Sequence, residues 1–150
     1  VKSLTKKFVI PGLRLGYLIA NENLIQKIRA IKPPWTVNSM ALAAGSFLMQ
    51  NNSAFKFSFK DLLEETNHLK NSINEMDALE VVPGYATYFL VKTNKGTAAE
   101  LKDFLMNENG LLIRNAGNFK GLDEKYFRIA TQSREQNQLL IKALKSWIQK

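Results

Sequence analysis

The sequence predicts an α/β fold in which a helical first half precedes a compact second half of order β-β-α-β-β-α. Two observations support this division. Apolar residues recur at helical spacing through much of the chain up to residue 77, whereas short apolar runs separated by turn residues follow from residue 78. Ser/Thr-x-x-Glu/Gln patterns at residues 97–100 and 133–136 mark the starts of the two later helices.

Length and composition fit one globular domain or a piece of a larger one. The chain has 150 residues, 45% of them hydrophobic, which is enough for a real core. It has no cysteine, which excludes disulfides and thiolate metal sites, and its single histidine gives no basis for a metal cluster. The net charge is +8, but the lysines are dispersed, so neither nucleic acid nor a membrane is an expected partner. A cytoplasmic location is compatible with these features.

The first half is expected to hold a short strand and three helices. The apolar run 15–20 has the length of a strand, and Asn21 after it is a potential N-cap for a helix that ends at residues 32–34, Lys-Pro-Pro. A second helix is expected to begin near Asn38 or Ser39. A long third helix is indicated by an apolar face formed by Leu62, Leu63, Thr66, Leu69, Ile73 and Met76.

The second half is expected to alternate strands and helices. Strands are predicted at 79–82, 85–92, 111–114 and 126–130. The helix that starts at Thr97 should end at Gly110. The apolar face of the last helix is predicted to contain Leu139, Leu140, Ala143, Leu144, Trp147 and Ile148.

A group of residues near the start of the chain points to a phosphate-bearing cofactor. Arg14 follows Lys6 by eight positions and is flanked by glycines that allow close backbone approach. Ser3 and Thr5 place hydroxyls on one face of a segment expected to be extended, and an arginine fork suits phosphate. Lys6 would be the covalent anchor, an activated amine that forms a Schiff base with a carbonyl cofactor. A solvated surface lysine is the structural alternative.

Two further arginines are candidates for binding anions of a substrate. Alternation along strand 126–130 places Arg128 on the face opposite to Phe127 and Ile129, so the apolar core does not require it. Arg114 ends the preceding predicted strand, before a turn-rich loop. A guanidinium matches a carboxylate bidentately, and a solvent-facing arginine is the alternative at both positions.

Residues 3–6 followed by residues 12–16 resemble the cofactor-lysine motif of fold-type-I pyridoxal-phosphate enzymes of the aspartate aminotransferase superfamily. The resemblance implies that pyridoxal 5'-phosphate is the cofactor and that Lys6 is its Schiff-base lysine. It implies cofactor-phosphate ligands at Ser3, Thr5 and Arg14. It also implies that Arg114 and Arg128 bind the substrate.

Within this superfamily the chain resembles two branches, the L-threonine O-3-phosphate decarboxylases of cobalamin biosynthesis and the histidinol-phosphate aminotransferases. The amino-acid sequence of several segments is closer to that of the decarboxylases. These segments are residues 10–17, 34–38, 111–122 and 126–130. The resemblance therefore implies decarboxylation of a phosphorylated amino acid, with transamination as the alternative.

Members of the superfamily are more than twice as long, so the chain is expected to be a C-terminal part. Its predicted division is the end of the large cofactor-binding domain at 1–52, a connecting long helix at 53–77 and a small domain at 78–150. The full-length form is expected to be a homodimer, and this part alone is expected to be inactive. A non-catalytic binding or dimerisation module is the alternative of another class.

Overall fold

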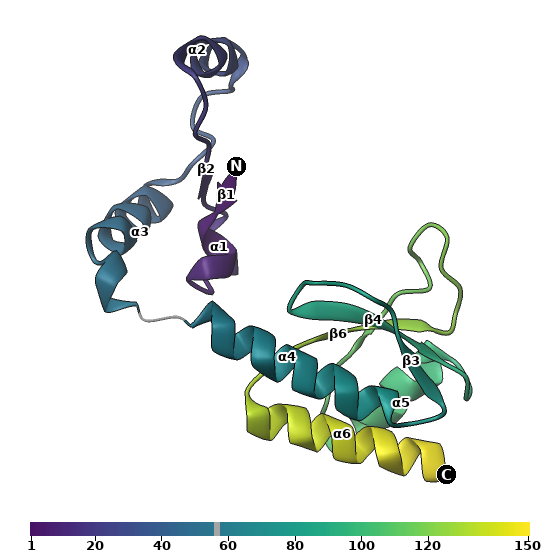
Figure 1. The fold of residues 1–150 in the computed structure, drawn as a ribbon. Helices are drawn as coiled ribbons and strands as arrows, with labels where there is room; N and C mark the ends of the chain where they lie inside the picture. Colours follow the sequence, from purple (N-terminus) through teal and green to yellow (C-terminus); the bar gives the residue numbers. More distant parts are fainter. Residues whose placement is uncertain (56–57) are drawn as a thin grey trace. The chain divides into compact units, whose positions relative to one another are not determined.

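The computed structural model describes residues 1–55 and 58–150, except for the side chain of Lys6. The chain, drawn as a ribbon in Figure 1, divides into two compact units, Val1–Phe57 and Ser58–Lys150. Each unit has its own hydrophobic cluster. Among the described residues, no helix is long and apolar enough to cross a membrane.

Within residues 1–55 the first unit contains three helices, two short strands and two 3-10 turns. Its elements are β1 Lys2–Ser3, α1 Leu4–Lys7, η1 Pro11–Leu13, β2 Gly16–Tyr17, α2 Glu22–Ile31, α3 Ser39–Gln50 and η2 Asn52–Ala54. The Asn21 side chain accepts a hydrogen bond from the backbone N–H of Leu24 at 2.9 Å, and Asn38 accepts one from Ala41 at 2.8 Å. Both predicted helix starts are thus confirmed, because each asparagine satisfies an otherwise unpaired amide.

Two expectations for the first unit were wrong. The segment expected to stay extended through Thr5 turns into α1 at Leu4, and the helical turn is closed by a hydrogen bond from the Phe8 amide to the Leu4 carbonyl, 3.0 Å. The strand expected over 15–20 shortens to Gly16–Tyr17. Its partner β1 pairs through two residues, so the rest of the apolar run has no ladder to join.

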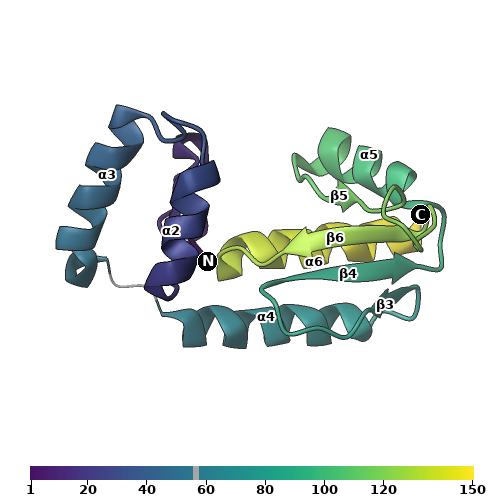
Figure 2. The same cartoon turned by 90° about the horizontal axis from the view of Figure 1, so that it is seen from above.

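The second unit has the predicted order β-β-α-β-β-α after a long first helix. Its elements are α4 Phe59–Asn74, β3 Leu79–Val81, β4 Tyr88–Thr93, α5 Ala98–Asn109, β5 Arg114–Asn115, β6 Tyr126–Ala130 and α6 Arg134–Gln149. The four strands form an antiparallel sheet of order β3-β4-β6-β5. Figure 2 shows the sheet strands side by side, with α6 passing behind β6 and α4 running along the side of β3 and β4.

One face of this sheet is buried under the helices, and the other is open. Phe127 and Ile129 of β6 and Phe89 of β4 are buried in the main hydrophobic cluster, to which α4, α5 and α6 also contribute. Residues that alternate with them, such as Tyr88 and Arg128, are exposed or half-buried. The predicted alternation along β6 is therefore confirmed, and it leaves Arg128 on the uncovered face.

Several elements of this unit differ from prediction at their ends. Strand β4 begins at Tyr88 instead of residue 85, and β5 begins at Arg114, where the predicted strand 111–114 was expected to end. The long helix runs over Phe59–Asn74, and residues 56 and 57 of the predicted segment 53–77 lie outside the described residues. The division of the chain at 53 and 78 stays a prediction. Leu139 was wrongly placed on the apolar face of α6: it is 58% exposed, because the buried stripe passes through Leu140 and Leu144 instead.

A side chain caps each later helix, and the predicted reciprocal capping box is present in α5, whereas α6 shows only its Ser133 half. Thr97 Oγ1 accepts a hydrogen bond from the Glu100 amide at 3.2 Å, and the Glu100 carboxylate accepts one from the Thr97 amide at 2.8 Å. Ser133 Oγ accepts from the Gln136 amide at 3.4 Å. At this second start, a hydrogen bond from its own backbone amide, helped by the Ser133 hydroxyl, lowers the pKa of the Glu135 carboxyl.

The reciprocal cap of α5 is expected to contribute measurably to stability. Thr97→Ala removes the acceptor for the Glu100 amide, and we expect the free energy of unfolding to fall by about 1 kcal/mol in urea denaturation. Ser146→Ala, on the exposed side of α6, is the control and should change it by less than about 0.5 kcal/mol. Equal effects of the two substitutions would contradict the role of the cap.

Candidate active site

The first unit folds the two halves of the N-terminal motif onto each other. In the β1–β2 pair Ser3 lies opposite Gly16, and the Leu4 amide donates to the Leu15 carbonyl at 3.1 Å. Leu4 and Leu15 are both buried in the small cluster that also contains Ala41. Burial of the two leucines therefore fixes the turn whose exposed side carries the candidate cofactor ligands.

The two predicted hydroxyl ligands are neighbours. Ser3 Oγ and Thr5 Oγ1 lie 2.7 Å apart, although the chain between them is the start of a helix rather than an extended strand. Ser3 is exposed and Thr5 is half-buried. Because a hydroxyl rotates to suit its partner, both groups are available to donate hydrogen bonds to one anion.

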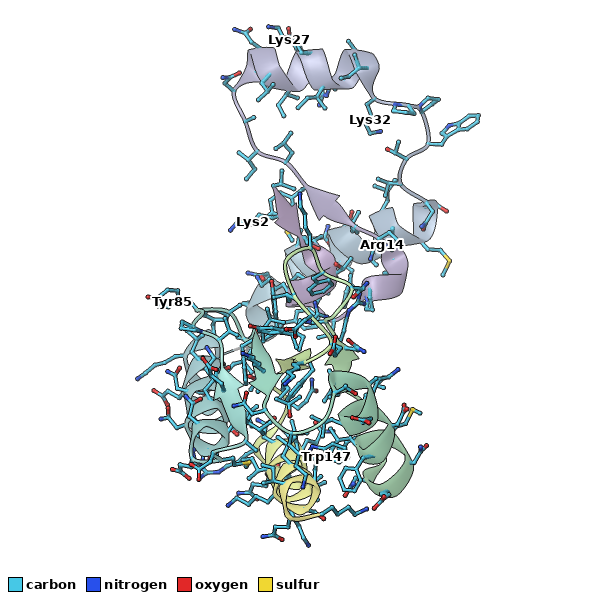
Figure 3. The ribbon with its side chains drawn as sticks, turned by 90° about the vertical axis from the view of Figure 1, so that its right-hand side faces the viewer. Lys2, Arg14, Lys27, Lys32, Tyr85 and Trp147 are labelled. Carbon is cyan, nitrogen blue, oxygen red and sulfur yellow. The ribbon has the colours of Figure 1, made fainter. Side chains whose placement is uncertain are left out.

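Arg14 stands on a left-handed turn between the two strands, at the end of η1 and two residues before β2. Its φ and ψ are 50° and 45°, a conformation uncommon for a residue with a side chain and often found at functional sites. Its Nη1 donates to the Pro11 carbonyl at 3.1 Å. The side chain is exposed (Figure 3), and a guanidinium has five N–H donors, so further donors remain for a ligand.

The glycines on the two sides of Arg14 differ in their surroundings. A Cβ added at Gly16 would lie 2.8 Å from the backbone carbonyl oxygen of Lys2, a contact that side chains essentially never make. At Gly12 an added Cβ would meet nothing within 4 Å. The expectation of close backbone approach therefore holds at Gly16, whereas Gly12 lies in open space in the described structure.

Lys6 belongs to α1 and follows Thr5 directly in the chain, and its side chain lies outside the described residues. The adjacent Lys7 donates from Nζ to the Asn52 side chain at 2.6 Å. Two adjacent hydroxyls, a guanidinium with free N–H groups and a closely turned backbone are the donor set that a phosphate monoester needs, so the residues present fit a phosphate-bearing cofactor. Their assignment as its ligands, and that of Lys6 as its anchor, stays a prediction.

In the second unit the structure brings the two candidate substrate arginines together. Arg114 of β5 and Arg128 of β6 are register partners, so both side chains leave the same, open face of the sheet. Directly opposed like charges destabilise a strand pair. The ion pairs within residues 1–55 and 58–150 are Lys60–Glu64 and Lys150–Glu108, so neither arginine is neutralised by a carboxylate there. Such a pair is suited to bind anions.

Each of these arginines lies over an aromatic ring that the sequence did not single out. The Arg128 guanidinium carbon is 5.4 Å from the centre of the Tyr88 ring, and that of Arg114 is 5.3 Å from the Phe119 ring. Alternation alone places Tyr88 on one face of β4. The contact with Arg128 could not be predicted without the register of β4 against β6.

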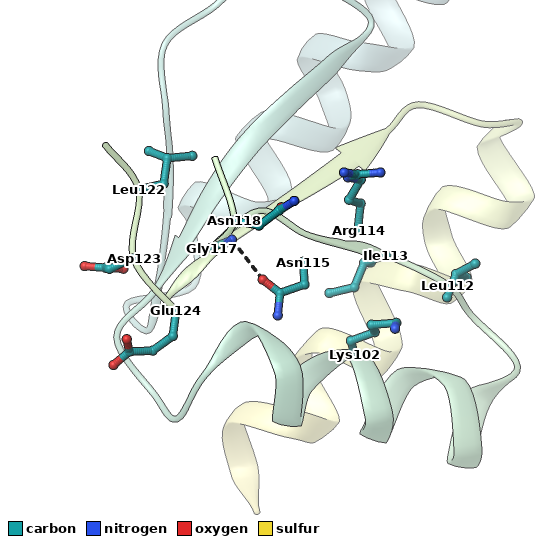
Figure 4. Close-up of a pocket in the computed structure, with 10 residues that line it drawn as sticks. All are labelled: Lys102, Leu112, Ile113, Arg114, Asn115, Gly117, Asn118, Leu122, Asp123 and Glu124. Carbon is teal, nitrogen blue, oxygen red and sulfur yellow. Dashed lines mark hydrogen bonds between the residues drawn. The ribbon is translucent and has the colours of Figure 1, made fainter. Parts of the chain in front are cut away.

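Two hollows adjoin the arginine pair. An open hollow of about 930 Å³ between α5 and the loop after β5 is lined by Arg114, Lys102 and Asn115, among others (Figure 4). Asn115 accepts a hydrogen bond from the Gly117 amide at 2.9 Å and so fixes the first turn of this loop. A smaller cavity of about 260 Å³ is lined by Arg128 together with both aromatic rings. The cofactor-ligand candidates and the arginine pair belong to different units.

The chain is similar to known pyridoxal-phosphate enzymes over nearly its whole length. A family model for class I and II aminotransferases matches residues 1–144. A Caldanaerobacter subterraneus subsp. tengcongensis protein, provisionally named threonine-phosphate decarboxylase, is 39% identical over 97% of this chain and 39% of its own length. A Methanosphaera stadtmanae histidinol-phosphate aminotransferase is 30% identical over 99% of this chain and 41% of its own length.

Among solved structures, the fold matches that of L-threonine-O-3-phosphate decarboxylase from Porphyromonas gingivalis. The TM-score is 0.91 and the sequence identity 41%, over 99% of this chain and 46% of that one. The chain spans about two fifths of the length of the curated relatives it matches, 39% and 41% for the two named above.

The close approach at Gly16 predicts opposite tolerance at the two glycines. Gly16→Ala forces the new methyl group against the Lys2 carbonyl, and we expect a loss of about 1–3 kcal/mol in the free energy of unfolding by urea denaturation. Gly12→Ala is the matched control and should be close to neutral. Equal losses at both positions would show that the β1–β2 contact does not constrain the turn.

Proposed function

The chain belongs to the class I and II aminotransferase family, and we propose that the whole protein decarboxylates L-threonine O-3-phosphate in cobalamin biosynthesis. The products would be CO₂ and (R)-1-aminopropan-2-yl phosphate. The observation that carries this proposal is the 41% identity to a solved L-threonine-O-3-phosphate decarboxylase over 99% of the chain. A cytoplasmic homodimer with pyridoxal 5'-phosphate as its cofactor is part of the proposal.

The N-terminal turn would hold the cofactor. Ser3 and Thr5 would donate hydrogen bonds from their adjacent hydroxyls to its phosphate, and Arg14 would add a permanent positive charge with forked donors. Gly16 would keep β2 close against β1, so that the turn does not open. Lys6 would bind the cofactor covalently through its amine.

The opposed arginines would hold the two anionic groups of the substrate. Two neighbouring guanidiniums suit a ligand with two separate anions. Within this proposal we place the carboxylate at Arg128 and the phosphate at Arg114. When bound, pyridoxal phosphate supplies an electron sink for a broken bond at Cα. By fixing both anions, the arginines would orient the bond from Cα to the carboxylate for cleavage, and CO₂ would leave.

Lys6 would then complete the reaction. With its amine free and protonated, Lys6 would act as a general acid. It would donate a proton to Cα at the position vacated by CO₂. The same residues would carry out transamination if the arginines oriented the Cα–H bond instead, so substrate anchoring rather than the cofactor would select the reaction.

The alternative is a histidinol-phosphate aminotransferase, favoured by the 30% identity to the Methanosphaera stadtmanae enzyme. The two functions differ in their products. We expect the full-length protein, given L-threonine O-3-phosphate, to release CO₂ measured with labelled carboxylate. Given histidinol phosphate and 2-oxoglutarate, it should form little glutamate. Glutamate formation without CO₂ release would overturn the proposal.

Lys6 provides a sharper test of the assigned chemistry. In the full-length holoenzyme, borohydride should fix the cofactor irreversibly to Lys6, detected by mass spectrometry of the peptide. Lys6→Ala should lower the turnover number by at least about 10²-fold, because a proton donor is lost together with the covalent anchor. Lys7→Ala is the matched control and should retain both activity and borohydride labelling. Labelling that persists in Lys6→Ala would refute the assignment.

A further inference from the structure

The ring of Tyr88 reaches Arg128 because of the register between two strands. Tyr88 pairs with Ala130 and Leu90 pairs with Arg128, so Tyr88 and Arg128 are diagonal neighbours on the open face. Diagonal neighbours are about 7–8 Å apart at Cα, within reach of an aromatic ring and a long side chain. The observed distance from the guanidinium carbon to the ring centre, 5.4 Å, is that of a cation–π contact.

Phe119 reaches Arg114 by a different route, from the loop after β5. The Phe119 amide donates to the Ala116 carbonyl at 2.9 Å, and its own carbonyl accepts from the Leu122 amide at 3.0 Å. These two bonds fix the backbone on both sides of Phe119. Its ring lies 5.3 Å from the Arg114 guanidinium carbon, so each member of the arginine pair is matched by one aromatic ring.

An aromatic ring can hold a guanidinium in place without occupying its N–H donors, which a carboxylate cannot do. The negative face of an aromatic ring attracts a guanidinium and restricts its movement while leaving the N–H donors at the guanidinium edge free. A carboxylate would occupy those donors and cancel the charge. The rings therefore offset part of the repulsion between opposed cations and keep both cations available to an anionic ligand.

The hydrophobic core does not require the Tyr88 ring. Tyr88 is 53% exposed and lies on the sheet face opposite to buried Phe89. Together with Phe119 and Arg128 it lines the cavity of about 260 Å³. A half-exposed ring beside a cation and a cavity is better explained by its contact with the cation than by burial of its own surface.

We propose that Tyr88 and Phe119 are positioning residues that hold the Arg128 and Arg114 guanidiniums in the orientation in which they bind the two anions of the substrate. This inference rests on the proposed function for the identity of the anions. The contacts themselves stand on the geometry of the second unit. The effect on the reaction passes through the arginines, so the rings should alter substrate binding and not the chemical step.

The contacts are tested first without reference to activity. In the full-length protein labelled with ¹⁵N-arginine, the Nε–Hε resonance of Arg128 should shift in Tyr88→Leu, because the ring current is lost. It should stay near its original position in Tyr88→Phe, which keeps the ring. Phe119→Leu should shift the Arg114 resonance and leave that of Arg128 in place. Resonances that do not move in the leucine variants would overturn the proposal.

The consequence for binding is tested by kinetics of the holoenzyme. Tyr88→Leu should raise the KM for L-threonine O-3-phosphate about two- to five-fold with kcat unchanged, the factor that a surface cation–π contact corresponds to. Tyr88→Phe should restore the original KM. Phe59→Leu, which removes a similarly exposed ring at the start of α4, away from this cavity, is the matched control and should leave KM unchanged.

The remaining outcomes separate this inference from the proposed function. An unchanged KM in Tyr88→Leu despite a shifted arginine resonance overturns the positioning role. So does a fall in kcat that Tyr88→Phe fails to reverse, since that result assigns the effect to the hydroxyl. If the wild-type protein does not decarboxylate the substrate, the proposed function fails. The dissociation constant of inorganic phosphate then replaces KM: a two- to five-fold rise in Phe119→Leu, which removes the ring beside Arg114, supports the inference, and no rise overturns it.

Discussion

Strand β6 holds the second unit together, because it pairs with β4 over five residues and with β5 over two. Its buried side, Phe127 and Ile129, packs in the main cluster under the helices. Its open side carries Arg128. Because side chains alternate along a strand, burial of one set fixes the direction of the other. A slip of one residue would send Arg128 into the core, so hydrophobic packing guarantees the orientation of the candidate anion site.

The first unit fixes the orientation of its candidate cofactor ligands with far less buried surface. Its cluster of buried residues contains Leu4, Leu15 and Ala41, and the β1–β2 ladder is two residues long. What holds the turn is close contact between backbones, made possible where Gly16 faces the Lys2 carbonyl. The exposed hydroxyls and Arg14 are thus attached to a small, tightly closed support.

The two units share a way of presenting charge. In each, cationic groups stand on an exposed surface while apolar residues directly next to them in sequence are buried, as Leu15 is beside Arg14 and Phe127 beside Arg128. Within residues 1–55 and 58–150 the ion pairs do not include these arginines. Backbone or aromatic contacts hold these arginines and leave N–H donors for a ligand. This arrangement serves the binding of an anion more than it serves the stability of the fold.

The sequence by itself determined the caps of the helices, the β-β-α-β-β-α order and the face of β6 that carries Arg128, because each depends on residues close together in the chain. It also singled out the residues of the candidate site. It did not determine that β2 stops at Tyr17, that Arg114 lies opposite Arg128, or that Tyr88 and Phe119 lie against these cations. Only the tertiary structure decided these points, since strand register and contacts between distant residues follow from packing of the whole unit.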